Sequence, residues 1–209
     1  MTIQDHVARE IIDVGAWVAA RGWVPATSGN FSRRIDAKTF AITASGVDKG
    51  TLSTADIRAV TLWSPLPSGV SAETPIHMAL YEDDPNVGAV LHTHSLAATV
   101  VSLAHAQDTK IALSDYEIVK GIRGYRSHAE TFELPLFSNS QDMDQLAKEI
   151  RIQVKAQPRM FGFVLCGHGL YAWGSDMREA RRHTEAIEFL LACELDKGRY
   201  RRSRTDRGS

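Results

Sequence analysis

The sequence has little cysteine, no long apolar run and no excess of either charge. Its 209 residues include two cysteines, Cys166 and Cys193, which are too few for a disulfide framework. No stretch approaches the roughly 20 apolar residues that cross a bilayer. The N-terminus is charged where a secretory signal would be apolar. We therefore expect a soluble protein of the reducing cytoplasm that has no membrane partner.

Charge and motif content exclude further classes of partner. The formal net charge is -1, so no overall basic field favours nucleic acid as a partner. The locally basic segment "KGRYRRSRTDRGS", residues 197–209, is expected to be a flexible tail. The chain contains neither a Walker motif nor a glycine-rich dinucleotide fingerprint after a strand. Nucleotide cofactors are therefore not indicated.

Composition and patterning predict one folded domain over residues 1–196. Apolar residues make up 44% of the chain and charged residues 23%, and no repeat or low-complexity linker divides it. Helical spacing or capping predicts helices over residues 3–21, 72–83, 96–106, 140–156 and 176–195, and a helical turn over 53–60. Strand patterns cover residues 29–36, 38–46, 87–95, 131–137 and 161–169. Such alternation indicates an α/β or α+β layered fold, between which periodicity alone does not choose.

Two histidines stand two residues apart in "VLHTHS", residues 90–95. The run is apolar with β-branched members, which predicts a buried strand. Side chains at i and i+2 share one face of a strand, so His92 and His94 could hold a common metal ion. The pair by itself fits packed histidines equally well, because a backbone hydrogen bond satisfies a buried imidazole.

A third histidine strengthens the metal interpretation. His168 lies between two glycines in "CGHG" at the end of an apolar strand, where small neighbours leave room for an ion or substrate. Three neutral imidazoles with an open fourth position make a catalytic zinc site, although such a site also suits iron, cobalt or manganese. The remaining histidines lack a paired partner and are interpreted as structural: His6, His77, His105, His128 and His183.

Five segments together resemble the class II aldolase/adducin family. They are "SGN" at 28–30, "ITASGVDKG" at 42–50, "SAETPIHMALY" at 71–81, "VLHTHS" and "CGHG", and the likeness extends from residue 3 to about 195. The resemblance implies a single-domain layered α/β/α sandwich around a central, largely antiparallel sheet, assembled as a homotetramer. It also implies one zinc ion per subunit, held by His92, His94 and His168. Scaffold domains of the family lack the complete histidine triad, so an enzyme is favoured.

The resemblance assigns two glutamates to proton transfer. In the aldolases of this family the acid/base is the glutamate of an "S-x-E" segment, which Glu73 matches. In its dehydratases the role belongs to the glutamate of an "E-x-x-K-G" segment, and Glu117 in "YEIVKGI" matches that one. We therefore expect dehydration of a ketose phosphate, with a zinc-dependent aldolase or 4-epimerase as the alternative. Without the resemblance, Glu117 would be interpreted as a solvated surface acid.

Two short loops of small residues are candidates for binding the substrate's phosphate. Each adjoins a predicted strand and presents backbone N–H and hydroxyl donors without obstruction, although either alone would be an ordinary turn. The residues that match the family's phosphate-contacting segments are Ser28, Gly29, Asn30, Thr43, Ser45, Gly46 and Ser71.

Overall fold

The computed structural model describes residues 3–205, which form five α-helices, two short 3-10 helices and eight strands. The α-helices are α1 (Asp5–Ala19), α2 (Thr74–Asp83), α3 (Leu96–Ala104), α4 (Met143–Ala156) and α5 (Met177–Thr205). The strands are β1 (Asn30–Arg34), β2 (Thr39–Thr43), β3 (Ile57–Thr61), β4 (Ala89–Thr93), β5 (Lys110–Leu113), β6 (Phe132–Phe137), β7 (Gly162–Leu165) and β8 (Gly169–Gly174). The 3-10 helices are η1 (Thr54–Asp56) and η2 (Glu117–Gly121).

All eight strands join one sheet in the order β3-β2-β1-β4-β8-β7-β6-β5. Every neighbouring pair is antiparallel except β6 and β7, which are parallel. The expected α/β fold with a largely antiparallel central sheet is thereby confirmed. Strand β4 lies in the middle, between β1 and β8, and all five of its residues are buried.

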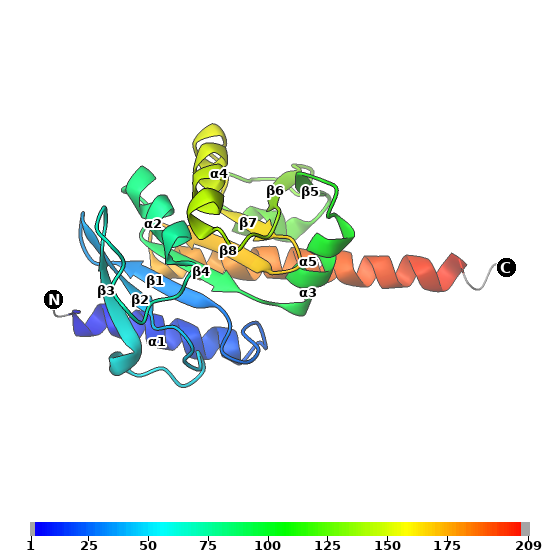
Figure 1. Cartoon of the computed structure of the whole chain (residues 1–209). Coiled ribbons are helices and arrows are strands. Elements are labelled where there is room, and N and C mark those ends of the chain that lie inside the picture. The colour runs from blue at the N-terminus through cyan, green and yellow to red at the C-terminus, as the bar shows by residue number, and fades with distance from the viewer. Residues whose placement is uncertain (1–2, 206–209) are drawn as a thin grey trace.

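Helices pack on both faces of the sheet, with α2 and α4 on one side and α1 with α5 on the other (Figure 1). Successive side chains of β4 point to opposite faces of the sheet. Ala89 and Leu91 belong to a core shared with α1, whereas Val90 packs with Ile76 and Leu80 of α2. His92 follows Val90 by two residues, so its imidazole emerges on the α2 side.

Three predicted elements differ from the structure. The strand expected over residues 161–169 ends at Leu165, and residues 166–168 form a turn that contains His168. The helical turn expected over residues 53–60 is limited to η1, which Ser53 caps through Asp56, and Ile57 then begins an edge strand paired with β2. The last helix continues well past Leu195 and ends at Thr205, so much of the expected tail is helical. Residues 206–209 lie outside the described part of the chain, and flexibility of the tail stays a prediction.

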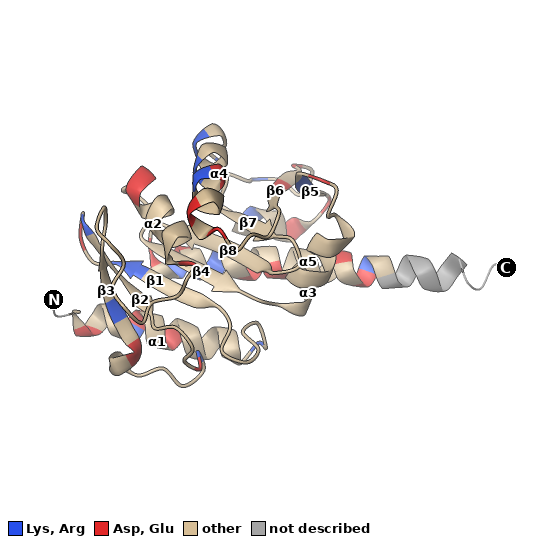
Figure 2. Ribbon diagram, viewed as in Figure 1, with Lys and Arg blue, Asp and Glu red and all other residues tan. Residues whose placement is uncertain are grey.

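The central strands β4, β8 and β7 contain no Lys, Arg, Asp or Glu, and all three are tan in Figure 2. Charged groups near these strands therefore come from other elements, such as Glu188 of α5, which contacts Thr93 of β4. Among the helices that the structure describes, none is both long and apolar enough to span a bilayer.

Candidate metal centre and phosphate-binding loops

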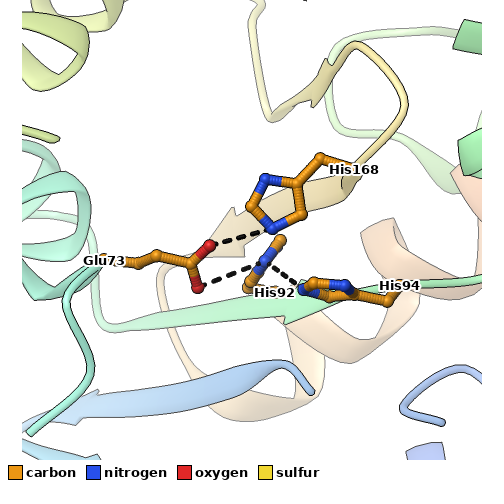
Figure 3. A group of neighbouring side chains, drawn as sticks. All are labelled: Glu73, His92, His94 and His168. Atoms are coloured by element: carbon orange, nitrogen blue, oxygen red, sulfur yellow. Dashed lines mark hydrogen bonds and ion pairs between the residues drawn. The ribbon is translucent and has the colours of Figure 1, made fainter. Parts of the chain in front are cut away.

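The three predicted histidines converge, and Glu73 joins them. His92 is on β4, His94 follows that strand, and His168 lies in the turn between β7 and β8. Glu73 is the residue before α2, whose first turn contains Pro75 as expected. One ligand atom from each of the four residues lies within 4.8 Å of the others. Figure 3 shows the carboxylate of Glu73 facing the imidazoles.

The spacing within this cluster suits a coordinated cation. The Nε2 atoms of His92 and His94 are 2.8 Å apart, and Glu73 oxygens lie 2.9 Å from His168 Nε2 and 3.4 Å from His92 Nε2. Tetrahedral zinc with bonds of about 2.0–2.1 Å separates its ligand atoms by roughly 3.3 Å. Two imidazole nitrogens 2.8 Å apart repel unless a proton or a metal ion lies between them. The donor set therefore fits a divalent metal ion.

Hydrogen bonds at Nδ1 fix two of the imidazole rings. His92 Nδ1 lies 3.0 Å from the carbonyl oxygen of Leu170, and His168 Nδ1 lies 3.2 Å from Oδ1 of Asn139. Both partners are acceptors, so each Nδ1 carries the proton and each Nε2 keeps its lone pair for a metal. Tyr171 stacks on the ring of His92 at 3.9 Å between centroids. These contacts hold the rings in orientations that suit coordination.

Glu73 faces the position that the sequence analysis expected to be open. Burial raises the pKa of its carboxyl, but when His92 and His168 are protonated their charges and hydrogen bonds outweigh burial and hold the pKa far below its usual range. A divalent ion held by the neutral imidazoles would act in the same direction. The carboxylate is therefore ionised, as a ligand or a base must be. His92 is fully buried, while the other three members are only partly covered, so the cluster has a side that faces solvent.

A chain of hydrogen bonds fixes the orientation of Glu73. Asn30 Nδ2 donates to Glu73 Oε2 at 2.6 Å, and Asn30 Oδ1 lies 2.5 Å from Nε2 of His77. His77 Nδ1 is 2.7 Å from the hydroxyl of Ser32, which in turn is 2.8 Å from the hydroxyl of Tyr81. Because Asn30 Oδ1 only accepts, His77 is protonated on Nε2 and its Nδ1 accepts from Ser32. Every group in this chain then has one defined role.

Two residues of this chain make contacts that the sequence did not indicate. Asn30, expected to bind phosphate, has its side-chain amide committed to Glu73 and His77, with a weaker bond to Ser71 at 3.3 Å. His77, interpreted as structural, hydrogen-bonds to Asn30, which in turn donates to Glu73. Burial, together with the charge of His92, lowers the pKa of His77 to about 3 and keeps the ring neutral. The sequence offered one signal for this role of His77, namely that it lies one helical turn after Glu73.

The predicted phosphate segments lie together. Ser45 N donates to the carbonyl oxygen of Gly69 at 2.9 Å, which joins the second loop to the segment containing Ser71. The bond between Asn30 and Ser71 joins the first loop to the same segment. Thr43 is fully buried and its Oγ1 accepts from the backbone of Phe31, so its hydroxyl is committed to the sheet. Ser45 and Gly46 remain exposed.

Glu117 does not belong to the cluster. It begins η2, its side chain is 68% exposed, and its carboxylate pairs with Lys120 and His128. The Lys120 hydrogen bond is the main cause that lowers the pKa of Glu117. Among the described residues of a single chain, the metal centre thus has one glutamate, Glu73.

The fold and this site define a single-domain α/β protein with a metal-binding centre of histidine and glutamate beside small-residue loops. Residues 9–195 match the family model described as the class II aldolase and adducin N-terminal domain. The chain therefore belongs to the class II aldolase and adducin family.

Named relatives agree with this assignment. The chain is 46% identical to the methylthioribulose-1-phosphate dehydratase of Sorangium cellulosum over 196 residues, 92% of each protein. It is 48% identical to the protein of that name from Acidiphilium cryptum, over 93% of this chain and 92% of that one. The l-fuculose-1-phosphate aldolase of Thermus thermophilus shares the fold, with a TM-score of 0.78, 24% identity, and coverage of 95% of this chain and 98% of that one.

Proposed function

We propose that this protein dehydrates 5-methylthioribulose 1-phosphate to 2,3-diketo-5-methylthiopentyl phosphate, a step of methionine salvage in the cytoplasm, with one zinc ion per subunit. The observation that carries the proposal is the cluster of three histidines and Glu73 beside converging small-residue loops. The relatives that share 44–48% of its residues bear the name of this dehydratase.

The metal ion would be held by His92, His94 and His168. When bound there, a divalent ion polarises a neighbouring carbonyl group and so acidifies the adjacent C–H bond. Glu73 is anchored by Asn30, whose Nδ2 donates to Glu73 Oε2, and Asn30 is in turn held by His77. A substrate that enters from the solvent-facing side would therefore meet a carboxylate whose orientation is already fixed.

In the dehydration, two proton transfers precede the enol, and its conversion to the diketone is a further one. The substrate has a carbonyl at C2 and hydroxyls at C3 and C4. A base removes the proton on C3, the C4 hydroxyl leaves as water after receiving a proton, and the resulting enol becomes the diketone. The net change is loss of one water. We assign protonation of the departing hydroxyl to Glu117, because its segment matches the dehydratases of the family.

Glu117 and the metal cluster do not meet within one chain, so this assignment requires a second copy of the chain. A homotetramer would supply it. Apolar side chains are exposed beside both segments, since Ile118 follows Glu117 and is 38% exposed, and Leu96 near His94 is 64% exposed. Such side chains favour burial against another protein surface.

A complementation experiment tests the shared site. Glu117→Gln should abolish dehydration with near-normal metal content, whereas His94→Ala should lose metal and activity together. When the two inactive variants are co-assembled in equal amounts, about a quarter of the sites receive an intact Glu117 from one subunit and an intact cluster from another, following random mixing around a closed ring. No recovery of activity would place Glu117 and the cluster in the same chain or remove Glu117 from the chemistry.

The position of Glu73 supports a second candidate, a zinc-dependent sugar-phosphate aldolase or 4-epimerase in which Glu73 is the base. The two functions give different products. Incubation with 5-methylthioribulose 1-phosphate, with zinc quantified alongside, should yield diketone and no aldehyde fragment. Release of dihydroxyacetone phosphate from fuculose 1-phosphate, without turnover of the methylthio sugar, would favour the aldolase.

A further inference from the structure

Lys49 is a buried cation between two of the small-residue segments. Its side chain is 2% exposed, and Nζ donates to the carbonyl oxygens of Thr27 at 2.9 Å and Val47 at 2.8 Å. Thr27 adjoins the "SGN" loop and Val47 follows the "TASG" loop. The ammonium group therefore ties together two loops that the sequence assigned to phosphate, and it does so from inside the protein.

This ammonium group has no anionic partner within the described chain. None of the described carboxylates lies within 4.0 Å of its Nζ. Burial lowers the pKa of Lys49, and only the more distant charges of Asp48 and Glu73 oppose that effect. Burying a charge that is paired only with carbonyl groups costs free energy, because the carbonyl dipoles replace only part of the hydration that the charge loses. An anion that binds beside the loops would offset this cost.

Apart from Arg58, which lies near Gly69, the other donors at the converging segments are neutral. They are backbone N–H groups and the hydroxyls of Ser45 and Ser71, which can bind phosphate oxygens but do not balance a double negative charge. The hydroxyl of Ser28 already donates to the carbonyl oxygen of Pro25 at 2.7 Å. Ser45 and Ser71 are brought together because Ser45 N donates to the carbonyl oxygen of Gly69, and Asn30 Nδ2 donates to the hydroxyl of Ser71. Lys49 adds to these donors the charge that they lack.

We propose that Lys49 is the electrostatic partner of the substrate's phosphate group and holds its two binding loops at a fixed separation, which makes the site selective for a phosphorylated sugar. This inference deepens the proposed function and depends on it for the identity of the sugar, but not for the class of anion. Lys49 acts on the phosphate and takes no part in proton transfer at C3 or C4.

Arg58 is the rival cation. A Cβ placed on Gly69 would lie 3.8 Å from its Nε, so the guanidinium is near the third segment. Its Nη1 donates to the carbonyl oxygens of Ala55 at 2.6 Å and Ile57 at 3.2 Å, which directs the group toward η1. Removing each charge separately distinguishes the two cations.

The kinetic test compares Lys49→Met with Arg58→Met and with Lys38→Met, which removes an exposed lysine. Each is assayed with 5-methylthioribulose 1-phosphate and with the unphosphorylated sugar at high concentration. Lys49→Met should lower kcat/KM for the phosphorylated sugar by about 100-fold, mainly through KM, because a buried charge partner is lost. Its turnover of the unphosphorylated sugar should be unchanged. Equal losses on both sugars, or a larger loss for Arg58→Met, would overturn the proposal.

A binding test does not depend on the reaction. Inorganic phosphate should raise the Tm of the wild-type protein above that in chloride of equal ionic strength, and the increase should vanish in Lys49→Met but persist in Lys38→Met. An undiminished increase in Lys49→Met would overturn the inference. If the wild type turns over no sugar yet shows the Lys49-dependent increase, the proposed function fails while the assignment of Lys49 stands. Lys49→Gln, which keeps N–H donors without the charge, replaces Lys49→Met if that variant does not fold.

Discussion

Glu188, a carboxyl group buried beneath the metal centre, allows a test of how burial of an ionisable group changes the free energy of unfolding with pH. It projects from α5 to the face of β4 opposite the histidines, where Thr93 Oγ1 donates to its Oε1 at 2.5 Å. The residue is 2% exposed, and its Oε2 has no hydrogen-bond partner among the described residues. Burial, only partly opposed by hydrogen bonds from Ser95 and Thr93, raises the pKa of Glu188 from 4.5 to about 7.

The perturbation is Glu188→Gln, which keeps the shape and the acceptor for Thr93 but cannot ionise. The folded-state pKa of Glu188 exceeds its unfolded value, so the stability contributed by the neutral carboxyl is complete below about pH 4.5 and is lost as pH rises through 7. Each tenfold change in proton affinity is worth about 1.4 kcal/mol. The variant should therefore gain about 3 kcal/mol over the wild type between pH 4.5 and 8.

Urea unfolding of both proteins at several pH values, at one fixed subunit concentration, measures this difference. The fixed concentration matters because association contributes to apparent stability. Other titrating groups are common to both proteins and cancel in the comparison. A difference in the free energy of unfolding that stays constant across this range would show that Glu188 does not titrate as its burial requires.

Three further predictions concern the site. His94→Ala should lower bound metal and activity in parallel, and full metal retention by elemental analysis would exclude it as a ligand. His77→Leu leaves Asn30 Oδ1 without its donor, so urea unfolding should show a loss of about 2–4 kcal/mol with lower turnover. Gly29→Ala should cost more stability than Gly46→Ala: both have φ above 70°, but the added Cβ meets His92 O at 2.7 Å only at Gly29. Equal thermal shifts would refute that difference.

Much of the centre was predictable because its parts follow local rules. The two-residue period of a strand places His92 and His94 on one face wherever that strand lies. Glycines on either side of His168 indicate space beside it, and Pro75 is tolerated in the first turn of a helix. These are short-range properties, and the structure confirms the histidine strand and the helix.

Local rules also failed in identifiable ways. The segment after Ser53 has a good capping residue, which favoured a helical turn, but Ile57 and Val60 gain more from burial in an edge strand beside β2. The last helix continues beyond its apolar segment to Thr205, so the predicted end near Leu195 is too early. Hydrophobic patterns locate the buried part of an element better than its end.

The sequence by itself determined the fold class, the alternation of the histidine strand and the family of the chain, since each depends on short-range spacing or on matched segments. Tertiary structure alone decided that Glu117 stays apart from the cluster within one chain, that Asn30 turns its amide to Glu73, and that Lys49 is buried without a carboxylate. Electrostatic partners and hydrogen-bond directions depend on distances between segments far apart in the chain. Those distances exist only once the sheet has assembled.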